Sequence, residues 1–558
     1  KIRMKKSILF FLLICNFLFL ANIQAQEVAP ENWFTSDFSD SKVRGTSADK
    51  AYKELLNGIP SVPVIVAVID SGVEADHEDL ASRMWVNKGE IPNNGIDDDK
   101  NGYIDDIHGW NFIGGPNGKN VGVDSYEATR VYVSLMPRFK NADSTKISKK
   151  DKKDYETYRK LKADIETKKA SAEANLAQIE STQNMIMGPL KAVQTALGRK
   201  KATLENVNAI EEGEDQQLAM GKMIMSQILG SGQVPTTNMD SIMIFVDDEL
   251  SEGIKHFKDQ VEYSYNTDFD SRKEIVGDNY ADYNERYYGN NDVQGPDAFH
   301  GTHVSGIIAA DRNNKIGIRG IADNALIMSV RAVPDGDERD KDIANAIRYA
   351  VDNGAKVINM SFGKGYSPGK KYVDEAVKYA EKKDVLLVHA AGNSSENNDS
   401  TENYPNDVYN KKGKPSKKVA ANWIEVGAMD WHGGEDMAAE FSNYGKKNVD
   451  IFAPGVDIYS TIPTQQYKNA NGTSMASPVV AGVAAMLRSY FPTLSAKDTK
   501  DILLKSSKKM DIKVKRPGSD ELVPFSELSA TGGYVDAYEA VKLASKKTGK
   551  AINMAGRS

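Results

Sequence analysis

The sequence contains almost no cysteine, since Cys15 is the only one among 558 residues. A single cysteine forms no intramolecular disulfide, so the fold depends on packing and on any bound metal ion. A large excess of charge of either sign is also missing, because 71 basic residues balance 78 acidic ones. No block of basic residues is interleaved with aromatic residues, which argues against nucleic acid as a partner.

Long hydrophobic runs are rare too, and the one that approaches membrane length stands at the start. Lys5 and Lys6 precede an apolar run from Ile8 to Leu20, and small and polar residues follow up to Ala25. This order predicts a secretory signal peptide over residues 1–25. A lipoprotein modified at Cys15 and an uncleaved anchor are the alternatives. We expect an exported protein, extracellular or periplasmic, with no stable membrane span and no cysteine after removal of the signal.

Three glycine-rich blocks carry candidate catalytic residues. The apolar, β-branched run Val64–Ile69 predicts a strand buried on both faces, and Asp70-Ser71-Gly72 ends it. Open α/β sheets build their sites at this end of their strands. His300 opens an apolar helix in the block FHGTHVSGIIAA, and Ser474 opens another in NGTSMASP.

These three residues suit nucleophilic catalysis. A helix start offers unpaired N–H groups and a positive dipole end where an oxyanion is stabilised. An activated serine needs a base, and the base needs an orienting carboxylate. Ser474, His300 and Asp70 supply these types in the chain order Asp, His, Ser. The alternative is a buried Ser/Thr-rich helix start without a catalytic role.

The three blocks resemble the signature blocks of the subtilisin-like serine proteases, the subtilases, over about residues 55–115 and 290–545. The resemblance implies a secreted serine endopeptidase acting on proteins or peptides, with His300 as the base and His303 as a packing residue. Asn393, in Ala-Ala-Gly-Asn, resembles the side-chain donor of the oxyanion hole. Ser361-Phe362-Gly363 resembles the segment that pairs with the substrate backbone and walls the pocket before the scissile bond. A catalytically silent binding or scaffold protein on the same fold is the alternative.

The pattern of elements predicts the fold class. Apolar strands at 326–330, 356–361 and 385–388 alternate with helices at 340–353 and 370–383, which indicates an α/β fold with a mainly parallel sheet covered by helices on both faces. Surface helices are expected at 495–507 and 536–545. The expected organisation is a signal peptide (1–25), a short N-terminal segment (26–60), a first catalytic part (61–119), a mostly helical insertion (120–290), a second catalytic part (291–548) and a tail (549–558).

The insertion is the main departure from the family pattern. Asp70 and His300 are 230 positions apart, whereas compact family members need only a few tens. Apolar residues at helical spacing predict a helix from about Lys146, a break at Met187-Gly188-Pro189 and a second helix to Leu197, forming an antiparallel hairpin or coiled coil. Another helix is predicted near 238–258. Met220, Met223 and Met225 suit either a core or an adaptable surface for a docking partner.

Two segments resemble calcium sites. The stretch NGIDDDKNGYIDD has oxygen-bearing side chains at alternate positions and a turn glycine, which predicts Ca²⁺ binding. The candidate ligands are Asp97, Asp99, Asn101 and Asp105. His108 replaces the final glutamate of an EF-hand, so that motif is not assigned, and a solvated acidic turn is the alternative. The family resemblance implies a second site with the side chains of Asp79 and Asn314 and the carbonyl groups of Ile316 and Ile318.

Overall fold

The structure is a computed structural model that describes residues 29–231, 234, 236–411 and 414–553. The predicted signal peptide lies outside this part. The chain forms two compact units, a smaller one over Tyr132–Phe269 and a larger one over Ala29–Val131 and from Asp270 onward. The smaller unit therefore covers fewer residues than the insertion expected at 120–290. Within the described residues, no helix is both long and apolar enough to cross a membrane.

The larger unit is built on a nine-stranded sheet in the order β12-β15-β9-β8-β5-β4-β1-β3-β2. Neighbouring strands are parallel, except that β12 runs antiparallel to β15. The strands are β1 Val64–Asp70, β2 Gly109–Asn111, β3 Ala325–Arg331, β4 Val357–Met360, β5 Leu386–Ala390, β8 Trp423–Met429, β9 Ile451–Pro454, β12 Lys508–Lys509 and β15 Gly533–Tyr534. The prediction of a mainly parallel sheet is confirmed.

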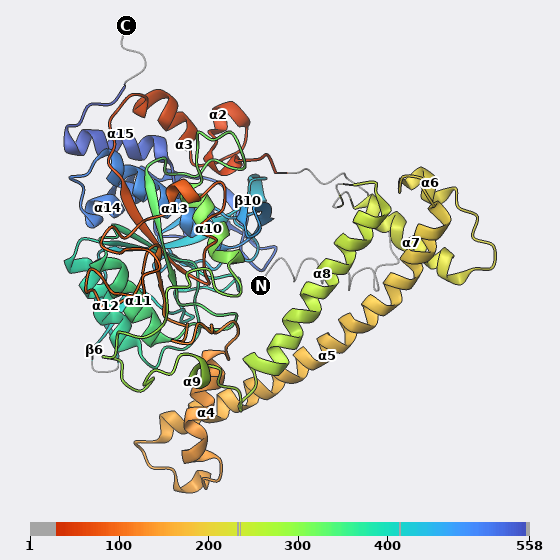
Figure 1. Cartoon of the computed structure of the whole chain (residues 1–558), viewed down its shortest axis with the longest axis horizontal. Helices are drawn as coiled ribbons and strands as arrows, with labels where there is room; N and C mark the ends of the chain where they lie inside the picture. Colours follow the sequence, from red (N-terminus) through yellow and green to blue (C-terminus); the bar gives the residue numbers. More distant parts are fainter. Residues whose placement is uncertain (1–28, 232–233, 235, 412–413, 554–558) are drawn as a thin grey trace. The chain divides into compact units, whose positions relative to one another are not determined.

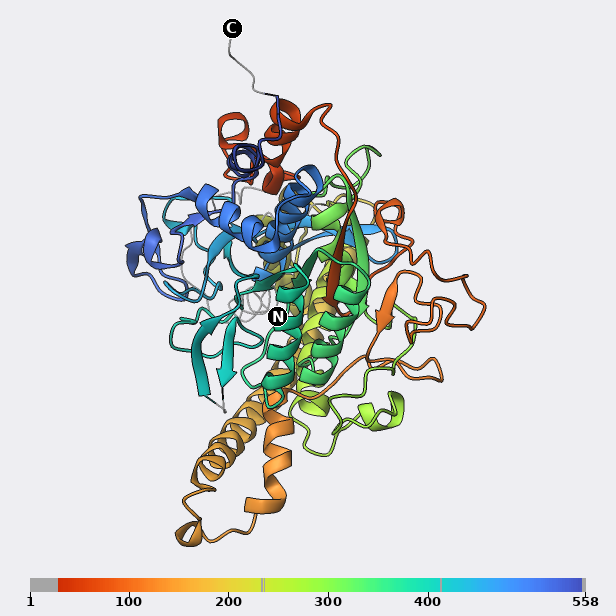
Figure 2. The same cartoon turned by 90° about the vertical axis from the view of Figure 1, so that its left-hand side faces the viewer.

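Helices cover this sheet, as Figures 1 and 2 show. Helices α11 and α12 pack against each other and against the sheet, while α13 contacts β4, β5, β8 and β9 and packs against α10, α14 and α15. Their bounds are α10 Phe299–Ala309, α11 Asp340–Asp352, α12 Lys370–Lys382, α13 Thr473–Tyr490, α14 Ala496–Ser506 and α15 Ala537–Thr548. Three hairpins flank the sheet: β6 Val408–Lys411 with β7 Lys414–Val419, β10 Ile458–Ile462 with β11 Gln466–Ala470, and β13 Lys513–Lys515 with β14 Leu522–Pro524. Short helices α2 Phe38–Ser41 and α3 Ala48–Lys50 precede β1.

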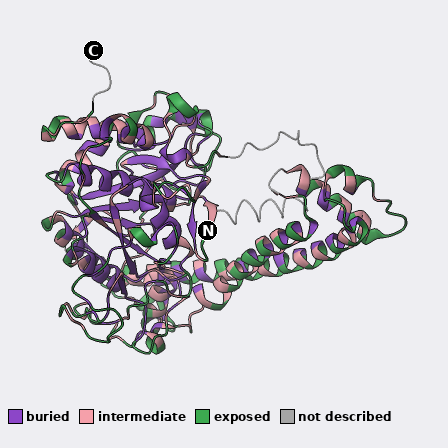
Figure 3. Ribbon diagram, turned by 45° about the horizontal axis from the view of Figure 1, so that its top comes forward, coloured by how far each residue is buried: buried purple, intermediate pink, exposed green. Residues whose placement is uncertain are grey.

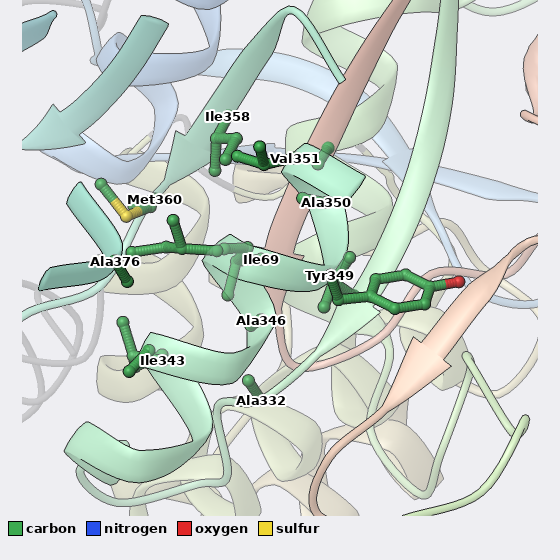
Figure 4. Close-up of a cluster of buried hydrophobic side chains, with 14 of the residues drawn as sticks. Ile69, Ala332, Ile343, Ala346, Tyr349, Ala350, Val351, Ile358, Met360 and Ala376 are labelled. Atoms are coloured by element: carbon green, nitrogen blue, oxygen red, sulfur yellow. The ribbon is translucent and has the colours of Figure 1, made fainter. Parts of the chain in front are cut away.

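One face of the sheet forms a hydrophobic core with α11 and α12. Ile69 of β1 and Met360 of β4 share this core with Ile343 and Ala346 of α11 and Ala376 of α12 (Figure 4). These side chains are at most 1% exposed. Successive strand residues point to opposite faces, and all residues of β1 except Ile65 are buried, so both of its faces are covered, which explains its continuous apolar run.

The smaller unit is helical. Its long helix α5 packs against α7 and α8, and buried and exposed residues alternate along these helices (Figure 3). The bounds are α4 Glu127–Phe139, which begins in the larger unit, α5 Lys152–Leu197, α6 Leu204–Asn208, α7 Gln216–Gly230 and α8 Met239–Asp259, and α9 Arg272–Ile275 follows in the larger unit. Met225 lies in the core of this unit, whereas Met220 and Met223 are exposed.

The predicted break at Met187-Gly188-Pro189 is wrong, because α5 continues through it to Leu197. Proline in a helix interior costs about 3 kcal/mol. Leu190, Val193 and Leu197 beyond it are at most 2% exposed, and burying each such side chain is worth roughly 1.5–3 kcal/mol. The burial of these three side chains therefore outweighs the tendency of Pro189 to end the helix. The hairpin partners of this helix are α7 and α8 rather than its own second half.

Candidate active site

Three adjacent strands bring the candidate catalytic segments to one edge of the sheet. β4 lies between β1 and β5 in a parallel arrangement. Asp70 is the last residue of β1, Ser361 directly follows β4, and Asn393 follows β5 by three residues. Since the carboxyl ends of parallel strands meet at the same edge, segments far apart in sequence converge there.

Asp70 and His300 are hydrogen-bonded, with 2.7 Å between Asp70 Oδ1 and His300 Nδ1. His300 is the second residue of α10, and two glycines allow this helix to approach β1. A Cβ on Gly301 would lie 2.2 Å from the carbonyl oxygen of Gly72, and Gly72 itself has a φ of +136°. The Asp70 side chain is 3% exposed and that of His300 is 36% exposed. Asp70 therefore orients the imidazole from its buried side, while the other side of the ring is open to solvent.

The charge of Asp70 changes the acidity of His300. Burial by itself lowers the pKa of the imidazole, but the nearby Asp70 carboxylate and its hydrogen bond raise the pKa above the ordinary 6.5. The protonated form of His300 is thus favoured in the folded protein at pH values near 6.5.

Ser474 is the second residue of α13. Its hydroxyl donates to the carbonyl oxygen of Ser361 at 3.1 Å, and among the described residues no hydrogen bond joins it to His300. Catalytic hydrogen bonds are often long or misaligned without substrate. Ser361 in turn donates to the Ser474 carbonyl at 3.0 Å, and its hydroxyl lies 2.8 Å from that of Ser477. The end of β4 and the start of α13 are therefore tied together at Ser474.

Asn393 is held by the same helix start. Its Oδ1 accepts from the backbone N–H of Thr473 at 2.8 Å and from the Thr473 hydroxyl at 2.9 Å. Within the described part of the chain, its amide Nδ2 has no hydrogen-bond partner, so a donor remains available. His303 is fully buried, and its Nε2 lies 2.9 Å from the Lys468 carbonyl oxygen. This placement agrees with a packing role for His303.

Comparison with known proteins identifies the family. The model of the peptidase S8, or subtilase, family matches residues 63–525, which is most of the chain. The chain belongs to the subtilase family. The match runs across the helical unit as well as the sheet.

Individual subtilases resemble parts of the chain. The thermophilic serine proteinase of Bacillus sp. (strain AK1) is 47% identical over 191 residues, which are 34% of this chain and 42% of that protein. Thermitase of Thermoactinomyces vulgaris is 42% identical over 191 residues, 34% of this chain and 61% of that protein. A solved structure of proteases from Pseudoalteromonas arctica PAMC 21717 has 27% identity and a TM-score of 0.38, covering 46% of this chain and 79% of that one. The chain thus spans about half the length of the first two relatives.

The candidate substrate segment of this subtilase has a free backbone edge. Ser361 is fixed to α13, and the N–H and C=O groups of Lys364 both pair with Tyr404 at 2.9 Å. Between these anchors, no backbone hydrogen bond within the described residues uses Phe362 or Gly363. The Phe362 ring stands edge-on to the ring of His389, with the centroids 6.2 Å apart. An extended peptide is the kind of ligand that pairs with such an edge.

The acidic loop of the subtilase brings two of the four predicted ligands, Asp99 and Asn101, together with Glu90 and Asp106. Oxygen atoms of Glu90, Asp99 and Asp106 lie within 4.8 Å of one another. Asn101 joins this cluster, since its Nδ2 contacts both Asp99 at 3.2 Å and Asp106 at 3.1 Å.

The other two predicted ligands accept backbone hydrogen bonds in the same loop. Asp97 accepts from the N–H groups of Asn101 and Gly102, and Asp105 accepts from those of Asn94 and Gly95. The alternate-position spacing did not select Glu90, which precedes the motif, or Asp106, which directly follows Asp105. Their acidic side chains on either side of the motif were the available signal.

The second candidate loop places its residues together. Asp79 is fully buried, and its Oδ1 lies 2.6 Å from Asn314 Nδ2. The backbone N–H groups of Asp311 and Ile318 also donate to this carboxylate, each at 3.1 Å. Burial raises the pKa of Asp79 despite these hydrogen bonds.

Proposed function

We propose that this chain is an exported serine endopeptidase that hydrolyses peptide bonds in proteins through Asp70, His300 and Ser474, with Asn393 in the oxyanion hole. The observation that supports it best is the 2.7 Å bond between Asp70 and His300 at the sheet edge where the Ser474 segment also converges, in a chain of the subtilase family. Protein or peptide substrates follow from the free edge of Phe362 and Gly363.

Each residue has a defined role in this proposal. Ser474 Oγ attacks the scissile carbonyl carbon, and His300 Nε2 takes its proton and gives it to the leaving amine. Asp70 accepts a hydrogen bond from Nδ1–H of His300, which fixes the tautomer and stabilises the imidazolium. The backbone N–H of Ser474 and the Nδ2 group of Asn393 donate to the oxyanion. Substrate binding must first release the Ser474 hydroxyl from the Ser361 carbonyl.

A fluorophosphonate probe tests the proposal, because it labels only an activated serine. The signal-free protein should be labelled at Ser474. A folded protein that is not labelled in the presence of calcium would favour a silent scaffold, and the Ser474–Ser361 hydrogen bond is the observation that keeps this second candidate open.

Casein separates two substrate classes: a scavenging protease digests it broadly, whereas a processing protease that needs a partner docked on residues 120–290 barely does.

The raised pKa of His300 gives a pH prediction. The base must be neutral, so kcat/KM should rise with pH through a midpoint above the ordinary 6.5. The same pair stabilises the fold below the unfolded-state pKa, and this contribution is lost as the pH rises through the folded-state pKa. Asp70→Asn should move the midpoint to lower pH and lower kcat by about 10⁴-fold, the loss known for this change in an unrelated serine protease. The pH dependence of kcat/KM should be measured for both proteins. The same midpoint in Asp70→Asn as in the unmodified protein would contradict the pairing of Asp70 with the catalytic base.

We also propose structural Ca²⁺ at the two loops. The donor sets are carboxylate, amide and carbonyl oxygens, the ligands that Ca²⁺ prefers. Burial raises the pKa of Asp106 to about 6. Glu90, Asp99, Asn101 and Asp106 would hold one ion, and Asp79 and Asn314 the other. Calcium would then hold the loops of a protein that has no disulfide.

Chelation should therefore lower the melting temperature. A ligand at a hundred times its Kd stabilises the folded state by about 2.7 kcal/mol. Calcium titration followed by calorimetry should show a smaller response in Asp99→Asn and in Asp79→Asn than in the unmodified protein. Asp98→Asn is the matched control, because Asp98 lies in the same loop and, within the described part of the chain, hydrogen-bonds Ile91 and Asn94 rather than the acidic cluster. An unchanged melting temperature after chelation would exclude structural calcium.

A further inference from the structure

Lys364 is a buried lysine next to the candidate substrate segment. It directly follows Gly363, and its side chain is 1% exposed. Its ammonium group lies 2.8 Å from Glu127 Oε2 and 2.9 Å from Asp340 Oδ1, and it donates to the Glu338 carbonyl oxygen at 2.8 Å. The ammonium group therefore donates hydrogen bonds to Glu127 and to the Glu338 carbonyl and forms an ion pair with Asp340, so its partners come from other parts of the chain.

This ion pairing fixes the charge state of both partners. Burial by itself lowers the pKa of Lys364, but Asp340, Glu127 and Glu338 raise it above its usual value. Burial likewise favours neutral Glu127, yet Lys364 and Arg130 lower its pKa to about 2. A buried ion loses much stabilisation when its partner is removed. Lys364 is consequently fixed in position by charge.

The position of Lys364 determines where the free edge lies. Among the described residues, the backbone hydrogen bonds and contacts that hold the Phe362–Gly363 segment lie at its two ends, in the Ser361 contacts with α13 and the Lys364 pairing with Tyr404. The side chain of Lys364 adds a third attachment, to Glu338 and Glu127. The backbone groups between these attachments are the ones that an extended substrate would meet.

Glu127 is itself held by an arginine of the same helix, within the larger unit. It is the first residue of α4, and Arg130 on the next turn contacts Glu127 at 2.8 Å and the carbonyl oxygens of Asp337 and Glu338 at 3.0 and 3.1 Å. From Tyr132 onward the same helix belongs to the smaller unit, where Tyr132 stacks on Tyr158 of α5. The contact with Lys364 is therefore made by the first turn of α4, within the larger unit.

We propose that Lys364 is a positioning residue that holds the Phe362–Gly363 edge for extended peptides, with the first turn of α4 as its support. This rests on the proposed peptidase function. Because the chemistry at Ser474 does not need the edge, loss of Lys364 weakens the binding of long substrates and spares small ones. The first turn of α4, which belongs to the larger unit, is thereby part of the substrate-binding machinery.

Kinetics with two kinds of substrate test this in the full signal-free chain. Lys364→Met combined with Glu127→Gln removes both charges of the pair. We expect a KM at least tenfold higher for a tetrapeptide anilide. The rates of fluorophosphonate labelling and of p-nitrophenyl acetate hydrolysis should stay within about twofold. Arg138→Met is the control on α4, since Arg138 forms exposed ion pairs with Asp151 and Asp154 and lies over the Phe139 ring; its kinetics should not change.

Other outcomes are equally informative. An equal loss on the ester and the peptide, or no rise in KM, would overturn the positioning role. If the double variant does not fold, Lys364→Arg keeps the charge but changes the contact geometry and must raise KM for the peptide alone. Absence of labelling in the unmodified protein would instead reject the proposed function, so the two failures are distinguishable.

Discussion

Replacing Ser474 with alanine is expected to lower kcat for peptide hydrolysis by about 10⁶-fold, the loss known for removal of the nucleophile in a protease of this family. The reason is that Ser474 Oγ is the atom that bonds to the substrate carbon. Any remaining hydrolysis would come from the oxyanion donors and from substrate binding. Steady-state kinetics with a peptide anilide, beside loss of fluorophosphonate labelling, measure the effect.

The fold should tolerate this change. Among the residues that the structure describes, the Ser474 hydroxyl makes one hydrogen bond, to the Ser361 carbonyl, and a typical bond contributes about 0.5–1.5 kcal/mol. The reverse bond, from the Ser361 hydroxyl to the Ser474 carbonyl, is kept. Ser489→Ala is a matched control at the other end of α13, where the hydroxyl bonds Val62. Activity retained in Ser474→Ala, or lost equally in Ser489→Ala, would contradict the role of Ser474 as nucleophile.

Local sequence patterns predicted those parts of the molecule whose structure is set locally. The β-branched run of β1 marks a strand buried on both faces, and the apolar run after Ser474 marks a buried helix; both are confirmed. The Asp70–His300 contact followed from placing a carboxylate at the end of a parallel strand. The family motifs then supplied Asn393, whose held amide oxygen and available Nδ2 agree with the expected donor.

Features that depend on tertiary packing were not predicted. Pro189 alone indicates a helix break, and only the burial of Leu190 and Val193 against other helices explains why α5 continues. Glu90 and Asp106 join Asp99 through loop folding rather than through spacing. Lys364 gives no signal in a sequence, because an isolated lysine is normally exposed and its carboxylate partners are far away along the chain.

Replacing Asn393 with alanine is expected to lower kcat by about 10²–10³-fold, a magnitude taken from the same substitution class in this family. The Nδ2 group donates to an oxygen whose charge develops only in the transition state. The interaction therefore stabilises the transition state more than bound substrate, so kcat should fall while KM stays within about twofold. Kinetics with one peptide anilide measure both parameters.

Asn393 has a second role that needs its own control, because its Oδ1 accepts two hydrogen bonds from Thr473 at the start of α13. Thr473→Val removes the hydroxyl bond to Asn393 and the one from the Gly392 N–H but leaves Nδ2 in place. If Asn393 Nδ2 is the oxyanion donor, Thr473→Val should lower the melting temperature but should lower kcat by less than about tenfold. Equal losses in both variants would mean that Asn393 acts by shaping the helix start, and a rise in KM with unchanged kcat would mean that it binds substrate in the ground state. Either result would remove Asn393 from the oxyanion hole and leave the Ser474 N–H as the proposed donor.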